Sequence, residues 1–130
     1  MSGFVDAGDP GAVEQVLRSA VAGIGMTGVL EQLQALPAIP LQPGRRGGLF
    51  REREPSVLKV DDRILRLYDN GAAELQHVVR GIVLATDAVS PAALPGILAA
   101  MVVRSLTAPA DVDQLSVVLT ALRDALAAGS

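Results

Sequence analysis

The chain has 130 residues, half of them hydrophobic, with a formal net charge of −3. This length and apolar content predict a single folded domain over residues 1–130 rather than a disordered chain. The sequence has no cysteine and one histidine, which excludes disulfides, thiolate nucleophiles, cysteine-type zinc sites and a multi-histidine metal site within one chain. A pI near 5.0 and a near absence of aromatic side chains argue against nucleic-acid binding.

The N-terminal stretch MSGFVDAGDPG lacks a basic segment followed by an apolar one. Arginines or prolines interrupt every longer apolar stretch before it could cross a bilayer. We therefore expect no signal peptide, no contact with a membrane and a cytoplasmic location. Ten arginines against one lysine, with abundant Ala, Gly and Val, indicate a GC-rich genome such as those of actinobacteria.

Two helices are predicted at the N-terminus. Asp9 can cap the first, and Pro10 fits its first helical position. The glycines of GIGMTG then interrupt the helical pattern, because glycine disfavours a helix interior. Thr27 is expected to cap a second, short helix that Pro37 ends.

Residues 37–55 are rich in proline and glycine, which predicts an irregular connector, mobile around residues 44–48. The connector carries four arginines that suit contact with an anionic partner. Two nearby glutamates offset half of that charge, so a solvated connector is the preferred interpretation. The four residues are Arg45, Arg46, Arg51 and Arg53.

Residues 56–86 predict an antiparallel meander. SVLKV and RILRLY are separated by a tight turn at Asp61-Asp62. Gly81 interrupts the later run HVVRGIVLAT, either as a bulge in one long bent strand or as a turn between two short strands. The bulge is preferred and gives three strands, whereas the turn gives four.

The loop at Asn70-Gly71 sets the register of the meander. A two-residue loop would bring the carboxylate of Glu74 onto the apolar face. A three-residue loop, with Gly71 in a left-handed conformation, instead pairs Leu65 with Leu75. It also keeps charged side chains together on the other face, so the three-residue loop is preferred.

The last third of the chain predicts two more helices. A turn over residues 90–94 leads into a helix from Pro95 to residue 106, and Asp111 with Gln114 three residues later predicts the cap of the final helix. The fold class is therefore α+β: two N-terminal helices, a three- or four-stranded antiparallel meander, and two C-terminal helices packed on one face of the sheet.

His77 is the candidate for chemistry. In the preferred register it stands opposite Arg63 and beside the Asp61-Asp62 turn, where a carboxylate can orient an imidazole as a general base. No nucleophile motif such as Gly-x-Ser-x-Gly accompanies it. A structural strand histidine is therefore preferred, and catalysis by His77 with Asp61 and Asp62 stays the alternative. The aspartates, Asp69 included, are interpreted as turn formers, because their spacing is not that of a calcium loop. No cofactor or metal is implied.

The final helix is apolar beyond one stripe, and such a surplus of aliphatic surface predicts a homodimer interface. The stripe consists of Leu115, Val118, Leu119, Leu122 and Leu126.

The stretch LQHVVRGIVLATDAVSPAALPGILAAMV resembles small conserved proteins of mycobacteria and related actinobacteria, over about residues 27–106. That family has no assigned activity, so the resemblance implies no catalytic residue. In size, charge and terminal helices, the chain is also similar to dimeric secretion chaperones, which is a likeness of architecture alone.

The sequence thus favours a non-catalytic protein-interaction module, chaperone- or adaptor-like, that self-associates through helices and a sheet edge. One alternative is a carrier or sensor that binds an apolar small molecule between sheet and helices, where small side chains leave room. Another is an enzyme that uses His77 with a turn carboxylate. A different protein is a further possible partner.

Overall fold

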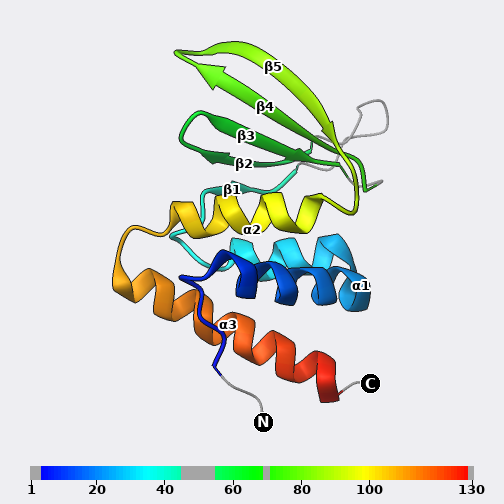
Figure 1. Ribbon diagram of the computed structural model, residues 1–130, viewed down its shortest axis with the longest axis vertical. Helices are drawn as coiled ribbons and strands as arrows, with labels where there is room; N and C mark the ends of the chain where they lie inside the picture. The colour runs from blue at the N-terminus through cyan, green and yellow to red at the C-terminus, as the bar shows by residue number, and fades with distance from the viewer. Residues whose placement is uncertain (1–3, 45–54, 69–70, 129–130) are drawn as a thin grey trace. The chain divides into compact units, whose positions relative to one another are not determined.

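The computed structural model describes residues 4–44, 55–68 and 71–128. Over these ranges the chain forms three helices and one five-stranded antiparallel sheet (Figure 1), so the α+β class is confirmed. The chain divides into two compact units, Met1–Ile39 with Pro95–Ser130, and Pro40–Leu94. The single domain and the packing of helices on one face of the sheet stay predictions. The elements are α1 (Pro10–Gln34), β1 (Leu41–Gln42), β2 (Ser56–Val60), β3 (Arg63–Leu67), β4 (Ala73–Val79), β5 (Ile82–Val89), α2 (Leu94–Ser105) and α3 (Pro109–Ala128).

Helix α1 begins and breaks where the sequence predicts. The side chain of Asp9 accepts a hydrogen bond from the Gly11 N–H at 3.0 Å, which caps the helix, and Pro10 follows. Gly25 has φ 81° and ψ 163°, values outside the helical region, so α1 is two helical stretches joined at a kink. The predicted interruption within GIGMTG is therefore confirmed.

Helices α2 and α3 begin slightly earlier than predicted. The Ser90 carbonyl accepts hydrogen bonds from the N–H groups of Ala93 and Leu94, which forms the predicted turn before α2. Helix α3 begins at Pro109, so the prediction that Asp111 caps it is wrong. The proline ring presets a helical φ two residues upstream, and Asp111 instead lies in the first turn, where its charge favours the helix N-terminus.

The helical unit has an aliphatic core. Helices α1 and α3 pack against each other, and each contributes fully buried side chains to the core. Dense packing of many small aliphatic groups supplies the stability that aromatic residues supply in other cores. The most buried aliphatic residues of its helices are Val13, Leu17, Ala20, Val29, Leu33, Leu98, Ala99, Val102, Leu115 and Leu119.

The sheet unit is a meander with the strand order β1-β2-β3-β4-β5. Its register matches the three-residue loop: Leu65 pairs with Leu75, and Gly71 has φ 88°, a left-handed value. Further pairs extend this row of leucines to Leu58 and Leu41. These leucines therefore lie on one face of the sheet, as the alternation predicts.

The preferred interpretation of Gly81 is wrong, and the alternative of a turn is correct. Val79 pairs with Ile82, and the two residues between them, Arg80 and Gly81, have φ values of 52° and 80°. Two consecutive positive φ values define the tight hairpin turn whose twist suits antiparallel strands, and glycine adopts them without steric cost. The bulge lies instead on β5, where Leu84 has no partner on β4.

The predicted connector contributes a strand that the sequence did not indicate. Leu41 and Gln42 form β1, paired with Leu58 and Val57 of β2. Together with the extra hairpin strand, this gives five strands rather than three or four. The expected mobility around residues 44–48 falls almost entirely outside the described residues.

Candidate functional site

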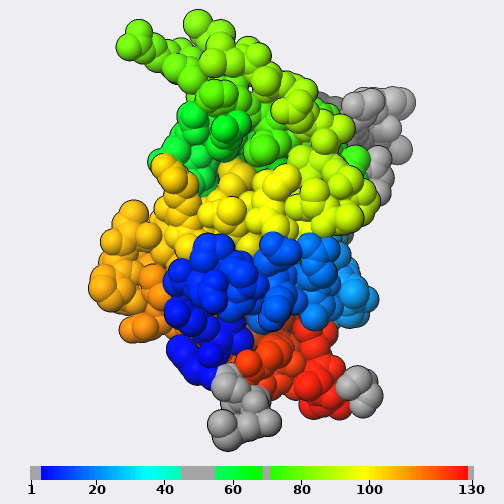
Figure 2. Space-filling view, viewed as in Figure 1, coloured from blue at the N-terminus to red at the C-terminus, as the bar shows by residue number. Residues whose placement is uncertain are grey.

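Strand β5 is the outer strand of the sheet and carries an exposed aliphatic run (Figure 1). Three consecutive large side chains are at least half exposed: Ile82 is 64% exposed, Val83 50% and Leu84 60%. In Figure 2 the end of the β4–β5 hairpin, in lime green, stands out from the other strands of the sheet. An exposed hydrophobic edge strand offers both apolar side chains and unpaired backbone groups to another strand.

The sheet becomes progressively exposed toward β5. The leucine row is buried at Leu58 and Leu65, half-buried at Leu75, and ends on β5 at the exposed Asp87. Across the described residues β5 pairs with β4 alone, so its outer backbone edge faces away from the sheet. Within the same ranges, this edge is therefore the main aliphatic feature that the sheet leaves uncovered.

Two charges of opposite sign flank the aliphatic run of β5. Arg80 lies in the turn before the strand, and Asp87 lies near its other end. Both side chains are exposed. The stretch between them, from Ile82 to Ala85, is purely aliphatic. We call residues 80–87 the β5 edge.

His77 lies on β4 as the register predicts, opposite Arg63 of β3. Its Nε2 is 2.8 Å from Oδ2 of Asp62, in the turn between β2 and β3. Because an ionised carboxylate only accepts hydrogen bonds, the Nε2–H group of His77 is the donor and Asp62 the acceptor. The Val78 N–H also donates to the Asp62 carbonyl at 2.8 Å, which continues the β3–β4 hydrogen bonding into this turn.

The hydrogen bond from His77 lowers the pKa of Asp62 below its ordinary value of 3.8. The Arg63 guanidinium, with Nε 3.8 Å from Oδ1 of Asp62, lowers that pKa further by its charge. On the sheet, the residues that face His77 on neighbouring strands are Arg63 and Ala85. A base with its orienting carboxylate is thus assembled, but the residues facing it supply no nucleophile.

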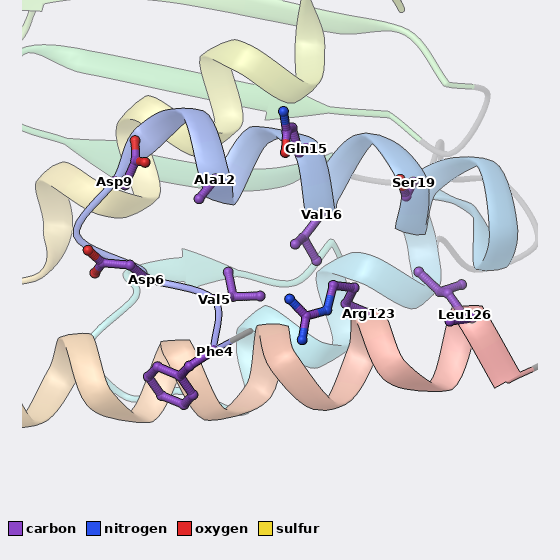
Figure 3. Close-up of a pocket in the computed structure, with 11 residues that line it drawn as sticks. Phe4, Val5, Asp6, Asp9, Ala12, Gln15, Val16, Ser19, Arg123 and Leu126 are labelled. Carbon is purple, nitrogen blue, oxygen red and sulfur yellow. The ribbon is translucent and has the colours of Figure 1, made fainter. Parts of the chain in front are cut away.

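A pocket of ≈ 630 Å³ lies within the helical unit, between the N-terminal segment, α1 and α3. Figure 3 shows Val5, Val16 and Leu126 around one space, with Arg123 of α3 among them. The N-terminal segment is held there by backbone hydrogen bonds to α3 side chains: the N–H of Val5 donates to Thr120 at 3.0 Å. The volume is within the range of small-molecule sites.

The remaining sequence candidates are dispersed. Leu115 and Leu119 of the α3 stripe are fully buried, so they belong to the core, whereas its other three members are partly exposed. The interface assigned to that stripe stays a prediction. The four connector arginines, Arg45, Arg46, Arg51 and Arg53, lie outside the described residues, as do Asp69 and Asn70.

Two further features are absent from the described residues. No cluster of three or more His, Asp or Glu side chains there could hold a metal ion. Within the same ranges, no helix is both long enough and apolar enough to cross a membrane.

The β5 edge is the feature that the sequence did not single out. Its one signal is the Arg-Gly pair between two aliphatic runs, which fits a two-residue hairpin turn as well as a bulge. No protein-family model, curated protein or solved structure matches the chain. The resemblance to actinobacterial proteins therefore stays a prediction.

Proposed function

We propose that this protein is a non-catalytic interaction module that self-associates by pairing the β5 edge with a strand of a second copy. The observation that supports the proposal is the exposure of Ile82, Val83 and Leu84 on the outer strand of the sheet. Adding a strand satisfies the unpaired backbone groups of that edge and removes the aliphatic side chains from water.

The edge carries little of the protection that edge strands of monomeric proteins usually have. Such strands are short, or carry lysine, proline or inward-pointing charges. Strand β5 spans eight residues and contains one charged side chain, Asp87. Its bulge at Leu84 interrupts pairing at one point and so favours a defined register over open-ended aggregation.

The test replaces an exposed valine by lysine at two places. Val83→Lys puts a charge into the proposed interface, and because dimer symmetry buries two such charges, the dimer dissociation constant should rise by about tenfold or more. Val117→Lys is the matched control, since Val117 of α3 is 59% exposed and lies in the helical unit. Sedimentation velocity across a concentration series measures both.

A dimeric wild type and Val117→Lys variant beside a monomeric Val83→Lys variant would support the proposal. A monomeric wild type would contradict it, and so would a dimer that Val117→Lys disrupts and Val83→Lys does not. The second result would locate the interface on α3, where the sequence predicts it.

The pocket of the helical unit favours a second candidate function, a carrier of an apolar small molecule. It differs from the site expected between sheet and helices, because its lining comes from the N-terminal segment, α1 and α3 alone. Native mass spectrometry of protein purified from its own host should detect a bound mass, and Ala12→Phe, which fills the pocket, should abolish it. A wild-type protein without added mass would contradict this function.

Catalysis by His77 has less support. The imidazole is oriented by Asp62, but Arg63 and Ala85 occupy the facing positions on the two neighbouring strands. The hydrogen bond between His77 and Asp62 links β4 to the β2–β3 turn, which is the structural role that the sequence favours.

A further inference from the structure

We infer that the strand of the second copy that pairs with β5 is β5 itself, in an antiparallel contact with two-fold symmetry that closes the assembly at two copies. This inference rests on the proposed self-association and specifies which strand is the partner. It follows from the difference between the two outer strands of the described sheet, β1 and β5.

Strand β1 is a poor partner for another strand. It consists of Leu41 and Gln42 alone, with Pro40 before it and Pro43 after it. Successive residues of an antiparallel strand direct their N–H and C=O groups to opposite sides, so a two-residue strand presents the groups of one residue outward. The flanking prolines have no N–H with which to extend the contact, and short length and proline are common protections of an edge.

Strand β5 has neither protection. It spans eight residues without a proline, and residues 82–88 are all exposed. Apart from the bulge at Leu84, about half of its residues direct backbone groups outward by the same alternation. Pairing with a second β5 therefore satisfies backbone groups along the strand in both copies, whereas pairing with β1 would satisfy those of one residue and leave most of β5 in water.

The side chains favour the same partner. Exposed aliphatic side chains of β5 lie on both faces of the sheet, because Ile82 and Val83 occupy consecutive positions in its pairing with β4. A second β5 brings aliphatic neighbours to each face. Strand β1 offers none, since Leu41 is buried and Gln42 is polar.

A contact between two β5 strands is also self-limiting. Each copy contributes the same edge, so the pair has no further β5 edge to add a third copy. A contact between β5 and β1 would instead leave one unused edge at each end of the pair, and such head-to-tail contacts continue into rings or filaments.

Two-fold symmetry has a consequence that a single substitution detects. The axis of an antiparallel pair passes through two opposite residues, so one residue of β5 faces the same residue of the second copy, with Cα atoms about 4.5–5.5 Å apart. A disulfide can bridge that separation, but cannot bridge Cα atoms more than about 7 Å apart. Residues one position along the strand exceed this limit, because each is displaced from its copy by two residues, or about 6.6 Å along the strand, in addition to the spacing between strands.

The experiment introduces one cysteine at a time into the full chain, which has none of its own. Each residue of Ile82–Val89 is replaced in turn, diamide serves as oxidant, and non-reducing electrophoresis measures the crosslinked fraction. That fraction should peak at one position, about tenfold or more above the value for Val117→Cys, because only this position meets the geometry of a disulfide. Val117 of α3 is 59% exposed and so reports crosslinking by random collision.

A second arm tests β1 directly. Gln42→Cys is mixed with each β5 variant in turn, and the mixed disulfide should not exceed the Val117→Cys background. Sedimentation velocity of the wild type should show growth to two copies and no further as concentration rises. Circular dichroism of each variant verifies that the fold is retained.

The outcomes separate this inference from the proposed function. A monomeric wild type would overturn the proposed function itself. A self-associating wild type whose β5 variants crosslink no more than Val117→Cys would overturn the inference alone. A mixed disulfide between Gln42→Cys and a β5 variant, or assemblies that keep growing with concentration, would likewise show that the contact is not closed.

Discussion

The hydrogen bond between His77 and Asp62 gives a potentially reactive imidazole a structural role. The imidazole joins the turn between β2 and β3 to β4 through a 2.8 Å hydrogen bond. Asp61 in that turn has φ 53°, a left-handed value that aspartate tolerates better than most residues. The hydrogen bond therefore fixes a turn whose backbone conformation is uncommon.

The lowered pKa of Asp62 has a testable cause. Because the His77 hydrogen bond is its largest cause and the Arg63 charge its smallest, His77→Val should raise the Asp62 pKa toward 3.8 more than Arg63→Gln does. NMR titration of the Asp62 carboxyl group in the wild type, His77→Val and Arg63→Gln measures which substitution raises the pKa more. A larger rise in Arg63→Gln would show that charge, and not the hydrogen bond, dominates.

The lowered pKa of Asp62 also predicts how the stability of the protein depends on pH. Since the folded-state pKa of Asp62 lies below its unfolded value near 3.8, the stabilisation is present above that value and is lost as pH falls through the folded pKa. The stability advantage of wild type over an Asp62→Asn variant, measured by urea denaturation across a pH series, should therefore shrink in strongly acidic solution. An advantage that stays the same down to the lowest pH would contradict this linkage.

At the scale of elements, the N-terminal segment is tied to α3 by side chains that the sequence did not mark. The Ala7 N–H donates to Oγ of Ser116 at 2.9 Å, and both residues are buried. Thr120 accepts from Val5 and donates its hydroxyl to the Ser116 carbonyl at 2.7 Å. Two successive turns of one helix thus anchor a segment without secondary structure of its own.

Removing the buried hydroxyl of Ser116 should destabilise the protein more than removing the partly buried hydroxyl of Thr120. Ser116→Ala leaves the buried Ala7 N–H without its acceptor, which should lower the free energy of unfolding by about 1–3 kcal/mol. Thr120→Val removes a partly buried acceptor, so water can replace it and the loss should be smaller. Urea denaturation measures both, and an equal or reversed order would contradict the role assigned to Ser116.

At the scale of the whole molecule, self-association links stability to concentration. If folded copies pair through β5 and unfolded chains do not, the melting temperature should rise by about 2–4 °C for each tenfold increase in protein concentration. Differential scanning calorimetry of the wild type and of Val117→Lys should show this rise. The melting temperature of the Val83→Lys variant should not change with protein concentration. If it rose with concentration as in the wild type, the copies would associate through a surface other than β5.

Several elements could be predicted because their signals are local. The Asp9 cap, the break at Gly25 and the register of Leu65 with Leu75 each depend on a few neighbouring residues or on alternation between two adjacent strands. The position of His77 followed from that register. These predictions are correct because cap, glycine and pairing preferences act over short distances in the chain.

The remaining features depend on contacts that periodicity does not encode. Leu41 and Gln42 are a strand only because β2 lies beside them, and an Arg-Gly pair suits a bulge as well as a hairpin turn. The start of α3 at Pro109 was misplaced because a capping pattern at Asp111 competed with a proline two residues earlier. Each miss reflects two local preferences that only the surrounding backbone resolves.

The sequence by itself determined the α+β class, the order of helices and meander, and the register of β3 with β4, because side-chain alternation and helix signals are properties of the chain. Tertiary structure alone decided which strand is last in the sheet. Ile82, Val83 and Leu84 are exposed on this last strand, which has one neighbour rather than two. An apolar run reads the same in a covered strand and at an edge, so only the pairing of strands reveals the surface on which the proposed association depends.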